Sequence, residues 1–169
     1  MDVPEAIAGD PEEAFRRISA QHVQAAYRLA WAILGDGAEA QDAAQDAFTS
    51  AWRQRFTLHD ADKFDAWFSR ILVNGCRDRL RRRARVPWPA DIDSEPSSPD
   101  HSSDTLERHV LHLEIGRLDP DQRLVVVLRY WKDMPVEEIA ACIGVPAGTV
   151  KSRLHRSIAR LRVALEEVR

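Results

Sequence analysis

The last third of the chain constrains the fold most, because its pattern is that of two helices joined by a tight turn. Pro135 suits the first position of a helix, where its missing N–H costs nothing. Gly144 can adopt the left-handed conformation that ends a helix, and Pro146 discourages its continuation. The next segment repeats apolar residues every three or four positions, at Val150, Leu154, Ile158, Leu161 and Leu165.

The opposite side of this second predicted helix is polar and basic. It bears Lys151, Ser152, His155 and Arg156. A basic helix that follows a turn in this way is the layout of a helix-turn-helix, whose second helix enters the major groove of DNA. The sequence therefore predicts a DNA-binding helix-turn-helix near the carboxyl end of the chain.

A break in composition divides the chain in two. Residues 86–105 hold four prolines and five acids but no Lys or Arg, so we expect a flexible Pro- and acid-rich linker. On both sides the periodicity is helical, and no convincing alternating strand is present. The helices are predicted near residues 11–34, 38–55, 63–84, 105–116, 120–131, 136–142 and 147–167. We therefore expect an all-α protein of two small helical domains, residues 1–85 and 106–169.

The distribution of charge explains how a chain of net charge −3 can bind DNA. Residues 1–62 are rich in acids. Residues 70–85 instead hold seven arginines against the single acid Asp78, and five further basic residues lie between Lys151 and Arg162. Two phosphate-attracting surfaces are thus predicted on a chain that is acidic elsewhere.

Several other classes of function are disfavoured. No apolar run approaches the length of a membrane span, and the acidic start of the chain lacks the order of a signal peptide. Cys76 and Cys142 are far apart, so we expect a reduced cytoplasmic protein. His109 and His112 share a helix face, but no further ligands complete a metal site. Without a phosphate loop, nucleophile elbow or credible acid pair, we expect no enzyme, cofactor or metal.

The predicted helices of the first domain each have two distinct faces. Asp42, Gln45, Asp46 and Thr49 share one face of the helix at 38–55, and Ala44, Ala47, Phe48, Ala51 and Trp52 lie towards another. Taken alone, this pattern also fits an ordinary amphipathic helix with a solvated acidic face.

The next helix, for which Asp62 is a predicted cap, has the apolar stripe Phe64, Trp67, Phe68, Ile71 and Leu72. Asn74, Arg77, Asp78 and Arg81 point away from that stripe. Its aromatic residues suit either unstacked bases or the protein core.

Together these segments resemble the extracytoplasmic-function (ECF) sigma factors of bacterial RNA polymerase, a branch of the primary-sigma superfamily. Residues 40–48 and 64–74 match motifs of sigma region two, and residues 118–123 and 148–156 match region four. The resemblance covers nearly the whole chain. It implies that the first domain is region two and that the second is region four.

The resemblance also implies partners. Region two would bind the β′ clamp helices of core RNA polymerase through Asp42, Gln45, Asp46, Phe48 and Trp52, and region four would meet the β flap. Gln41 and Asp46 depart from the usual family residues at this site. The linker would thread the polymerase channel. Family members commonly serve a stress or envelope regulon under an anti-sigma factor, which would clamp the two domains. No membrane insertion of this chain is expected.

Promoter contacts follow from the same resemblance. The loop at 57–62 would capture a flipped base of the minus-ten element, and the next helix would contact the same element. The matching residues are His59, Asp60, Phe64, Trp67, Asn74 and Arg77. The minus-thirty-five element would be read by Thr149, Lys151, Ser152, His155 and Arg156. His155 stands where the family often has an aromatic residue or Arg, which leaves the upstream sequence preference open. Lys151 in place of Arg would lose the bidentate reading of guanine.

Two other functions compete with this interpretation. A stand-alone helix-turn-helix regulator would bind an operator tightly without polymerase, and an interaction module would only sequester polymerase. The acidic first domain instead predicts that the isolated protein binds promoter DNA poorly until core enzyme separates and orients the domains.

Overall fold

The computed structural model describes residues 11–83 and 105–166, which we call the first and second halves. The first half contains α1 (Pro11–Leu34), α2 (Gly37–Arg53), two 3₁₀ turns η2 (Arg55–Thr57) and η3 (Ala61–Lys63), and α3 (Phe64–Arg83). The second contains α4 (Thr105–Gly116), α5 (Pro120–Tyr130), α6 (Val136–Ile143) and α7 (Ala147–Glu166). None of these described residues forms a strand, and the all-α prediction is confirmed. The predicted linker at 86–105 lies outside them, except for Thr105.

Polar side chains fix the starts of several helices. The Asp36 carboxylate accepts a hydrogen bond from the Glu39 amide of α2 at 2.9 Å, and Asp119 accepts one from the Asp121 amide of α5 at 3.0 Å. Asp60, rather than the predicted Asp62, caps the turn before α3. Pro135 likewise lies one position before α6 instead of at its first residue.

The helix-turn-helix forms as its turn residues predict. Gly144 ends α6 in the left-handed region with φ 68°, and Pro146 precedes α7. Val150 and Leu161 of the predicted apolar stripe are buried, while Leu154 and Ile158 are half-buried against the smaller cluster around Leu118.

The first half is a three-helix unit whose centre is lined by small residues. The buried face of α2 consists of Ala40, Ala43, Ala44, Ala47 and Ala51, which let α1 and α3 approach closely. Aromatic rings fill one end of this core. The rings of Phe48 and Phe68 stack at 4.5 Å, and those of Phe64 and Phe68 at 5.5 Å.

A buried arginine organises the second half. Arg123 is 5% exposed, and its guanidinium donates hydrogen bonds to the carbonyls of Ile115, Gly116 and Leu118, at and just after the end of α4. Burial, with the nearby charge of Arg83, lowers the pKa of Arg123 to about 10. Arg123 therefore satisfies two carbonyls of the last turn of α4 that have no partner within that helix, and the Leu118 carbonyl that follows it.

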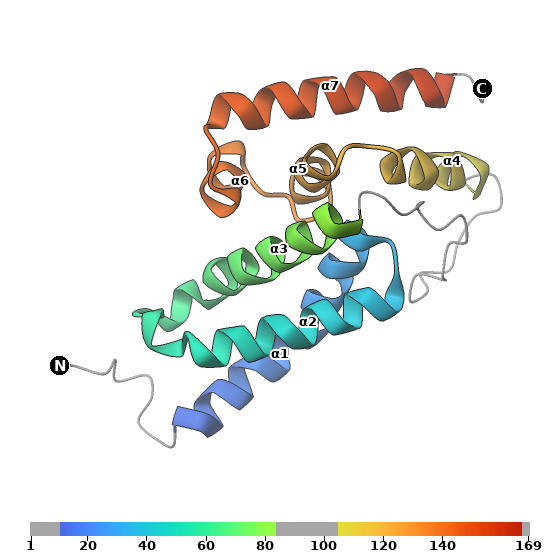
Figure 1. Ribbon diagram of the computed structural model, residues 1–169. Coiled ribbons are helices and arrows are strands. Elements are labelled where there is room, and N and C mark those ends of the chain that lie inside the picture. The colour runs from blue at the N-terminus through green and yellow to red at the C-terminus, as the bar shows by residue number, and fades with distance from the viewer. Residues whose placement is uncertain (1–10, 84–104, 167–169) are drawn as a thin grey trace.

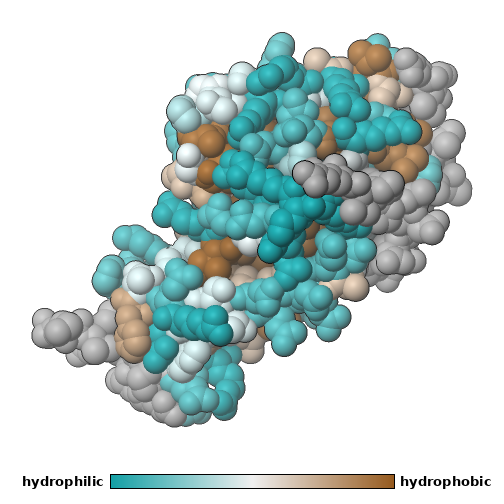
Figure 2. Space-filling model, in the orientation of Figure 1, coloured by the Kyte–Doolittle hydropathy of each residue, from teal (hydrophilic) through white to brown (hydrophobic). Residues whose placement is uncertain are grey.

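The two halves pack against each other and share one apolar cluster. Met134, Ile139 and Ile143 of the second half join the cluster that contains Leu29 and Leu72 of the first. Figure 1 shows α5 and α6 lying between α3 and α7, with α2 on the far side of α3, while α1 also contacts α5. On the face drawn in Figure 2 hydrophilic residues predominate, and hydrophobic patches are scattered among them. The packing brings helix α3 directly under the helix-turn-helix.

Two glycines of the helix-turn-helix allow a controlled test of the left-handed conformation at the end of α6. A Cβ at either Gly144 or Gly148 would meet no neighbouring atom within 4 Å, but only Gly144 has a positive φ. Gly144→Ala should therefore lower the free energy of unfolding by about 1–2 kcal/mol through backbone strain alone. Gly148→Ala, in the first turn of α7, should leave the free energy of unfolding unchanged or raise it by up to about 1 kcal/mol. Urea unfolding measures both, and equal effects would contradict the assigned turn.

Candidate nucleic-acid and partner interfaces

Helix α2 presents an acidic surface. Asp42, Gln45 and Asp46 are all exposed, while Phe48 and Trp52 lie half-buried at its edge. Asp46 also forms an ion pair with Arg79 of α3 but keeps most of its side chain in solvent. The structure thus brings the five predicted polymerase-contacting residues onto one side of the first half.

An open groove of about 510 Å³ adjoins this acidic surface. Phe48 and Trp52 line it from α2, and Phe15 and Val23 line it from α1. Val23 is 46% exposed, and the Ser19 hydroxyl at the groove is buried without a hydrogen-bond partner. An apolar groove beside exposed carboxylates suits the docking of a protein helix better than that of a nucleic acid.

The predicted base-capturing loop lies between α2 and α3. His59 is exposed and Asp60 is partly exposed, whereas the Phe64 ring is 3% exposed and packs 4.8 Å from the His22 ring. Phe64 thus supports the loop from the core and faces no open surface. Trp67 is half-buried and its indole N–H donates to the Thr57 hydroxyl at 3.1 Å.

The turn η2, just before this loop, contains an exposed aromatic residue that no motif in the sequence singles out. Phe56 is 75% exposed, and the Arg55 guanidinium lies 4.2 Å from its ring and 3.9 Å from the Trp52 ring. Its signal in the sequence was an Arg-Phe pair directly after the acidic helix. Exposed rings with an adjacent guanidinium are suited to stacking on unpaired bases.

Asn74 and Arg77 are placed against the second half of the protein. The Asn74 amide donates to the Cys142 carbonyl at 3.3 Å, and Arg77 donates to the Ile143 carbonyl at 2.9 Å. Both carbonyls belong to the last turn of α6, where they lack intrahelical partners. The face of α3 that was expected to meet the minus-ten element therefore meets the helix-turn-helix in this structure.

Asp121, near the start of α5, is the acidic centre of this contact. Its carboxylate accepts from Arg77 at 2.9 Å and from Arg153 of α7 at 2.8 Å, with Arg81 at 3.4 Å. Burial acts to raise the pKa of Asp121, but the hydrogen bond from Arg77 and the charges of Arg77, Arg153 and Arg81 outweigh it. The net result is a lowered pKa.

Ion pairs also neutralise much of the predicted basic patch on α3. Arg83 pairs with Glu39 at 3.0 Å and with Asp36 at 3.8 Å, and Arg79 pairs with Asp46. The phosphate-attracting surface predicted from residues 70–85 is therefore partly occupied by acids of the same chain.

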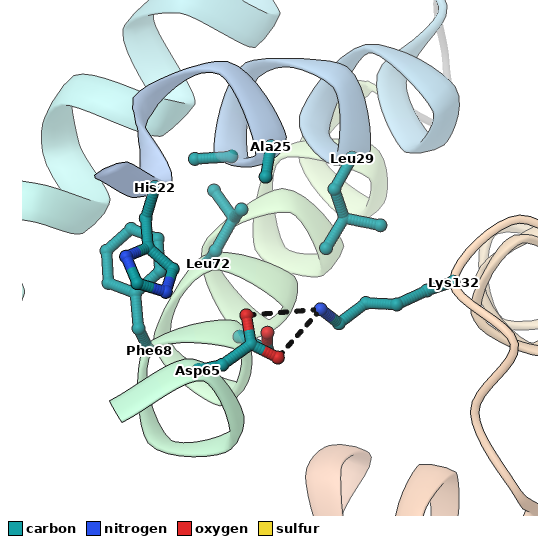
Figure 3. A pocket seen from close by; sticks show the side chains of 9 residues that line it. His22, Ala25, Leu29, Asp65, Phe68, Leu72 and Lys132 are labelled. Atoms are coloured by element: carbon teal, nitrogen blue, oxygen red, sulfur yellow. Dashed lines mark hydrogen bonds and ion pairs between the residues drawn. The ribbon is translucent and has the colours of Figure 1, made fainter. Parts of the chain in front are cut away.

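A further ion pair joins the halves near the start of α3. Lys132, which follows α5, reaches Asp65 of α3 at 3.1 Å (Figure 3). The pair borders a cavity of about 20 Å³ lined by His22, Leu29 and Leu72, which has room for roughly one water molecule.

The reading face of the helix-turn-helix remains open. Lys151, Ser152, His155 and Arg156 are all exposed on α7, and Thr149 is half-buried at its start. The Arg156 guanidinium donates to the Ser152 carbonyl at 3.2 Å, which lays it along this face. The predicted minus-thirty-five contacts thus form one basic surface that the first half does not cover.

Two other expectations concern features outside these surfaces. Within residues 11–83 and 105–166, no group of three or more His, Cys, Asp or Glu residues is arranged to hold a metal ion. His112 instead stacks beside Trp31 at 6.2 Å, and burial followed by the charges of His109 and Arg123 lowers its pKa. Among the described helices, none combines the length and apolar character needed to cross a membrane.

Comparison with known proteins finds sigma-factor relatives along most of the chain. Residues 18–86 match the family model for sigma-70 region 2, and residues 108–161 match that for sigma-70 region 4. The chain is 37% identical to the RNA polymerase sigma-E factor of Streptomyces coelicolor over 82% of its own length and 78% of the relative. It is 31% identical to the ECF RNA polymerase sigma factor SigL of Mycobacterium tuberculosis, covering 90% and 89% of the two chains.

A solved structure agrees with these matches. It is the complex of the sigma factor RpoE with the anti-sigma factor NepR from Bartonella quintana. The chain resembles it with a TM-score of 0.68 and 25% identity, over 93% of this chain and 99% of that one.

The contact at Asp121 predicts a pH dependence of stability. A carboxyl whose pKa is lowered by folding adds stability above its unfolded pKa of about 3.9, and that contribution is lost as pH falls through the folded value. NMR titration of the Asp121 carboxyl should therefore show a midpoint below its ordinary range. In the Arg77→Gln variant the midpoint should rise, because the strongest opposing partner is gone. An unchanged midpoint in that variant would show that Arg77 does not lower the pKa of Asp121.

Proposed function

Since this chain belongs to the ECF sigma factors, we propose that it binds bacterial core RNA polymerase, directs it to specific promoters and helps to melt the minus-ten element. The observation that supports this most is the separation of two exposed surfaces with opposite charge. The acidic side of α2 and the basic face of α7 lie on different halves of the molecule.

The acidic surface suits a protein partner. Asp42, Gln45 and Asp46 offer acceptors to basic residues of the β′ clamp helices, and the adjoining groove with Phe48 and Trp52 offers apolar area. The second half carries its own exposed aromatic residues at the end of α5, where Tyr130 is 64% exposed and Trp131 is 48% exposed. We assign these two rings to the contact with the β flap.

The two proposed DNA surfaces bind different forms of the promoter, one as a duplex and the other as an opened single strand. The face with Lys151, Ser152, His155 and Arg156 reads the minus-thirty-five duplex, and the positive end of α7, which begins at Ala147 near Thr149, suits a phosphate. His59, Asp60 and Trp67 at the loop, together with Asn74 and Arg77, contact the opened minus-ten strand. Strand opening then requires binding of unstacked bases and no covalent chemistry.

This role places the protein in the cytoplasm with polymerase and assigns it no catalytic activity. The solved relative from Bartonella quintana is bound to an anti-sigma factor. By analogy, we propose that an anti-sigma protein also holds this chain inactive until a stress or envelope signal releases it.

Transcription with purified components tests the proposed function. The protein, mixed with core polymerase and a library of genomic promoter fragments, should give run-off transcripts from a specific subset. Core polymerase alone should give none of these transcripts. If the protein instead binds an operator tightly by itself and adds no transcript, it is a stand-alone helix-turn-helix regulator.

A pair of arginines on α7 tests the assignment of the upstream contact. Arg156 lies on the reading face, whereas Arg162 is exposed nearly two turns further along the helix. Arg156→Ala should weaken holoenzyme binding to the minus-thirty-five duplex by about 1–3 kcal/mol. Arg162→Ala, with the same loss of charge, should change it far less.

Binding of core polymerase is the internal control for both variants, since neither residue lies on the acidic surface. Equal losses of DNA and polymerase binding in Arg156→Ala would contradict the division of labour between the two halves.

A further inference from the structure

Phe56 exposes an aromatic ring at a position where the family resemblance assigns no contact. The residue is 75% exposed, the largest value among the exposed large hydrophobic residues of the described chain. Single exposed apolar residues are common on protein surfaces and need no explanation by themselves. The backbone that holds this ring, the groups beside it and the charge around it together indicate a binding role.

The turn that carries Phe56 is held in place by hydrogen bonds. The Thr57 amide and the Thr57 hydroxyl both donate to the Gln54 carbonyl at 2.8 Å. The Trp67 indole N–H donates in turn to the Thr57 hydroxyl at 3.1 Å, which ties η2 to α3. The ring is therefore presented from a fixed backbone, and binding to it costs little ordering entropy.

One face of the Phe56 ring is covered by a cation. The Arg55 guanidinium lies over this ring, 4.2 Å from its centroid, and over the Trp52 ring at 3.9 Å. Arg55 also donates to the Trp52 carbonyl at 2.8 Å, which fixes its position. Attraction between a guanidinium and an aromatic face restrains the orientation of the ring. The exposed area of Phe56 therefore lies on its other face and its edge.

The neighbouring aromatic residues offer less open surface to a base. Phe64 and Phe68 are each 3% exposed, and their rings stack on each other in the core. Trp67 is half-buried, and its indole N–H is already donated to Thr57. Among the described residues around the predicted base-capturing loop, Phe56 thus presents the most open aromatic face on which an unpaired base can stack.

The charge of the chain changes sign where α2 ends. Residues 36–52 hold four acids and no Lys or Arg, whereas residues 53–63 hold three basic residues against two acids. Arg53 is exposed, and the side chain of Lys63 is 77% exposed. Phe56 is also absent from the lining of the apolar groove beside the acidic surface. These features favour a nucleic-acid strand at Phe56 over the protein partner proposed for α2.

We propose that Phe56 stacks on one unpaired base of the opened minus-ten strand, next to the base captured by the loop at 57–62. This inference rests on the proposed function, because an opened promoter supplies such a base. Stacking on an aromatic ring is tolerant of base identity, so Phe56 adds affinity for the strand with little sequence preference. It favours the melted promoter over the duplex, in which each base already stacks on its neighbours.

Binding of the holoenzyme to a single strand tests the proposal. The probe is a fluorescent oligonucleotide that spans the minus-ten segment of a promoter recovered by run-off transcription. Phe56→Ala should weaken binding about tenfold, as expected for the loss of one stacked base. Phe56→Trp should retain the native affinity because an indole also stacks. Phe56→Leu keeps an apolar side chain without a flat ring and should bind as weakly as Phe56→Ala.

Removal of single bases from the probe then locates the stacked base. An abasic site is placed at each position of the segment in turn, and each probe is bound to native and Phe56→Ala holoenzyme. At one position the two losses of affinity should not add, because either change removes the same contact. Additive losses at every position would overturn the proposal.

The control variant is Val163→Ala, which shortens an apolar side chain of α7 that is 58% exposed and lies on none of the proposed surfaces. Its holoenzyme should bind the probe with native affinity. Phe56→Ala should keep native affinity for core polymerase and a native midpoint in urea, since the ring is largely outside the core.

Three results for the Phe56 variants would contradict the stacking role. Loss of core binding in Phe56→Ala with native affinity for the strand would assign the ring to the polymerase surface. A large loss of stability in Phe56→Ala would assign the ring to the fold, and native affinity of Phe56→Leu would exclude stacking. Failure of the proposed function would appear earlier, as absence of any specific transcript from the native holoenzyme.

Discussion

The carboxylate of Asp121 is the interaction on which the arrangement of the two halves depends. It binds arginines from α3 and α7 and lies in the first turn of α5, so one anion links three helices. Without that charge, Arg77, Arg81 and Arg153 would face one another around a partly buried space. Such a cluster is unfavourable because like charges repel most where water is excluded. This ion network and the apolar cluster that the halves share together hold the helix-turn-helix over α3.

The same principle explains how an acidic chain can contain two basic surfaces. Arg79 and Arg83 pair with acids of α2, and Arg77 pairs with Asp121, so much of the positive charge on α3 is balanced inside the molecule. The basic face of α7 is left exposed. In the proposed function, the acidic surface of α2 meets polymerase and the exposed face of α7 meets duplex DNA. The residues of α3 proposed to contact the minus-ten strand would become available only when their partners within the chain are exchanged.

Local patterns in the sequence were sufficient for the helices and for most of the exposed faces. The spacing of Val150, Leu154 and Leu161 and the left-handed Gly144 predicted the helix-turn-helix, because both are properties of neighbouring residues. The partners of Asn74 and Arg77 lie 44 to 68 positions away, and periodicity carries no information about such contacts. Helical spacing also could not distinguish Phe64, which is buried, from Phe56, which is exposed. The burial of Arg123 could not be predicted either, because it depends on the carbonyls at the end of α4 to which its guanidinium donates.

The proposed function requires the polar face of α3 to exchange the second half of its own chain for promoter DNA when polymerase binds. The most direct measurement is the distance between spin labels at two exposed alanines, Ala66 on α3 and Ala159 on α7, by double electron–electron resonance. The free protein should give one narrow distribution at the distance set by the packed halves. Addition of core polymerase should replace it with a longer distance. An unchanged distribution in the holoenzyme would contradict the account.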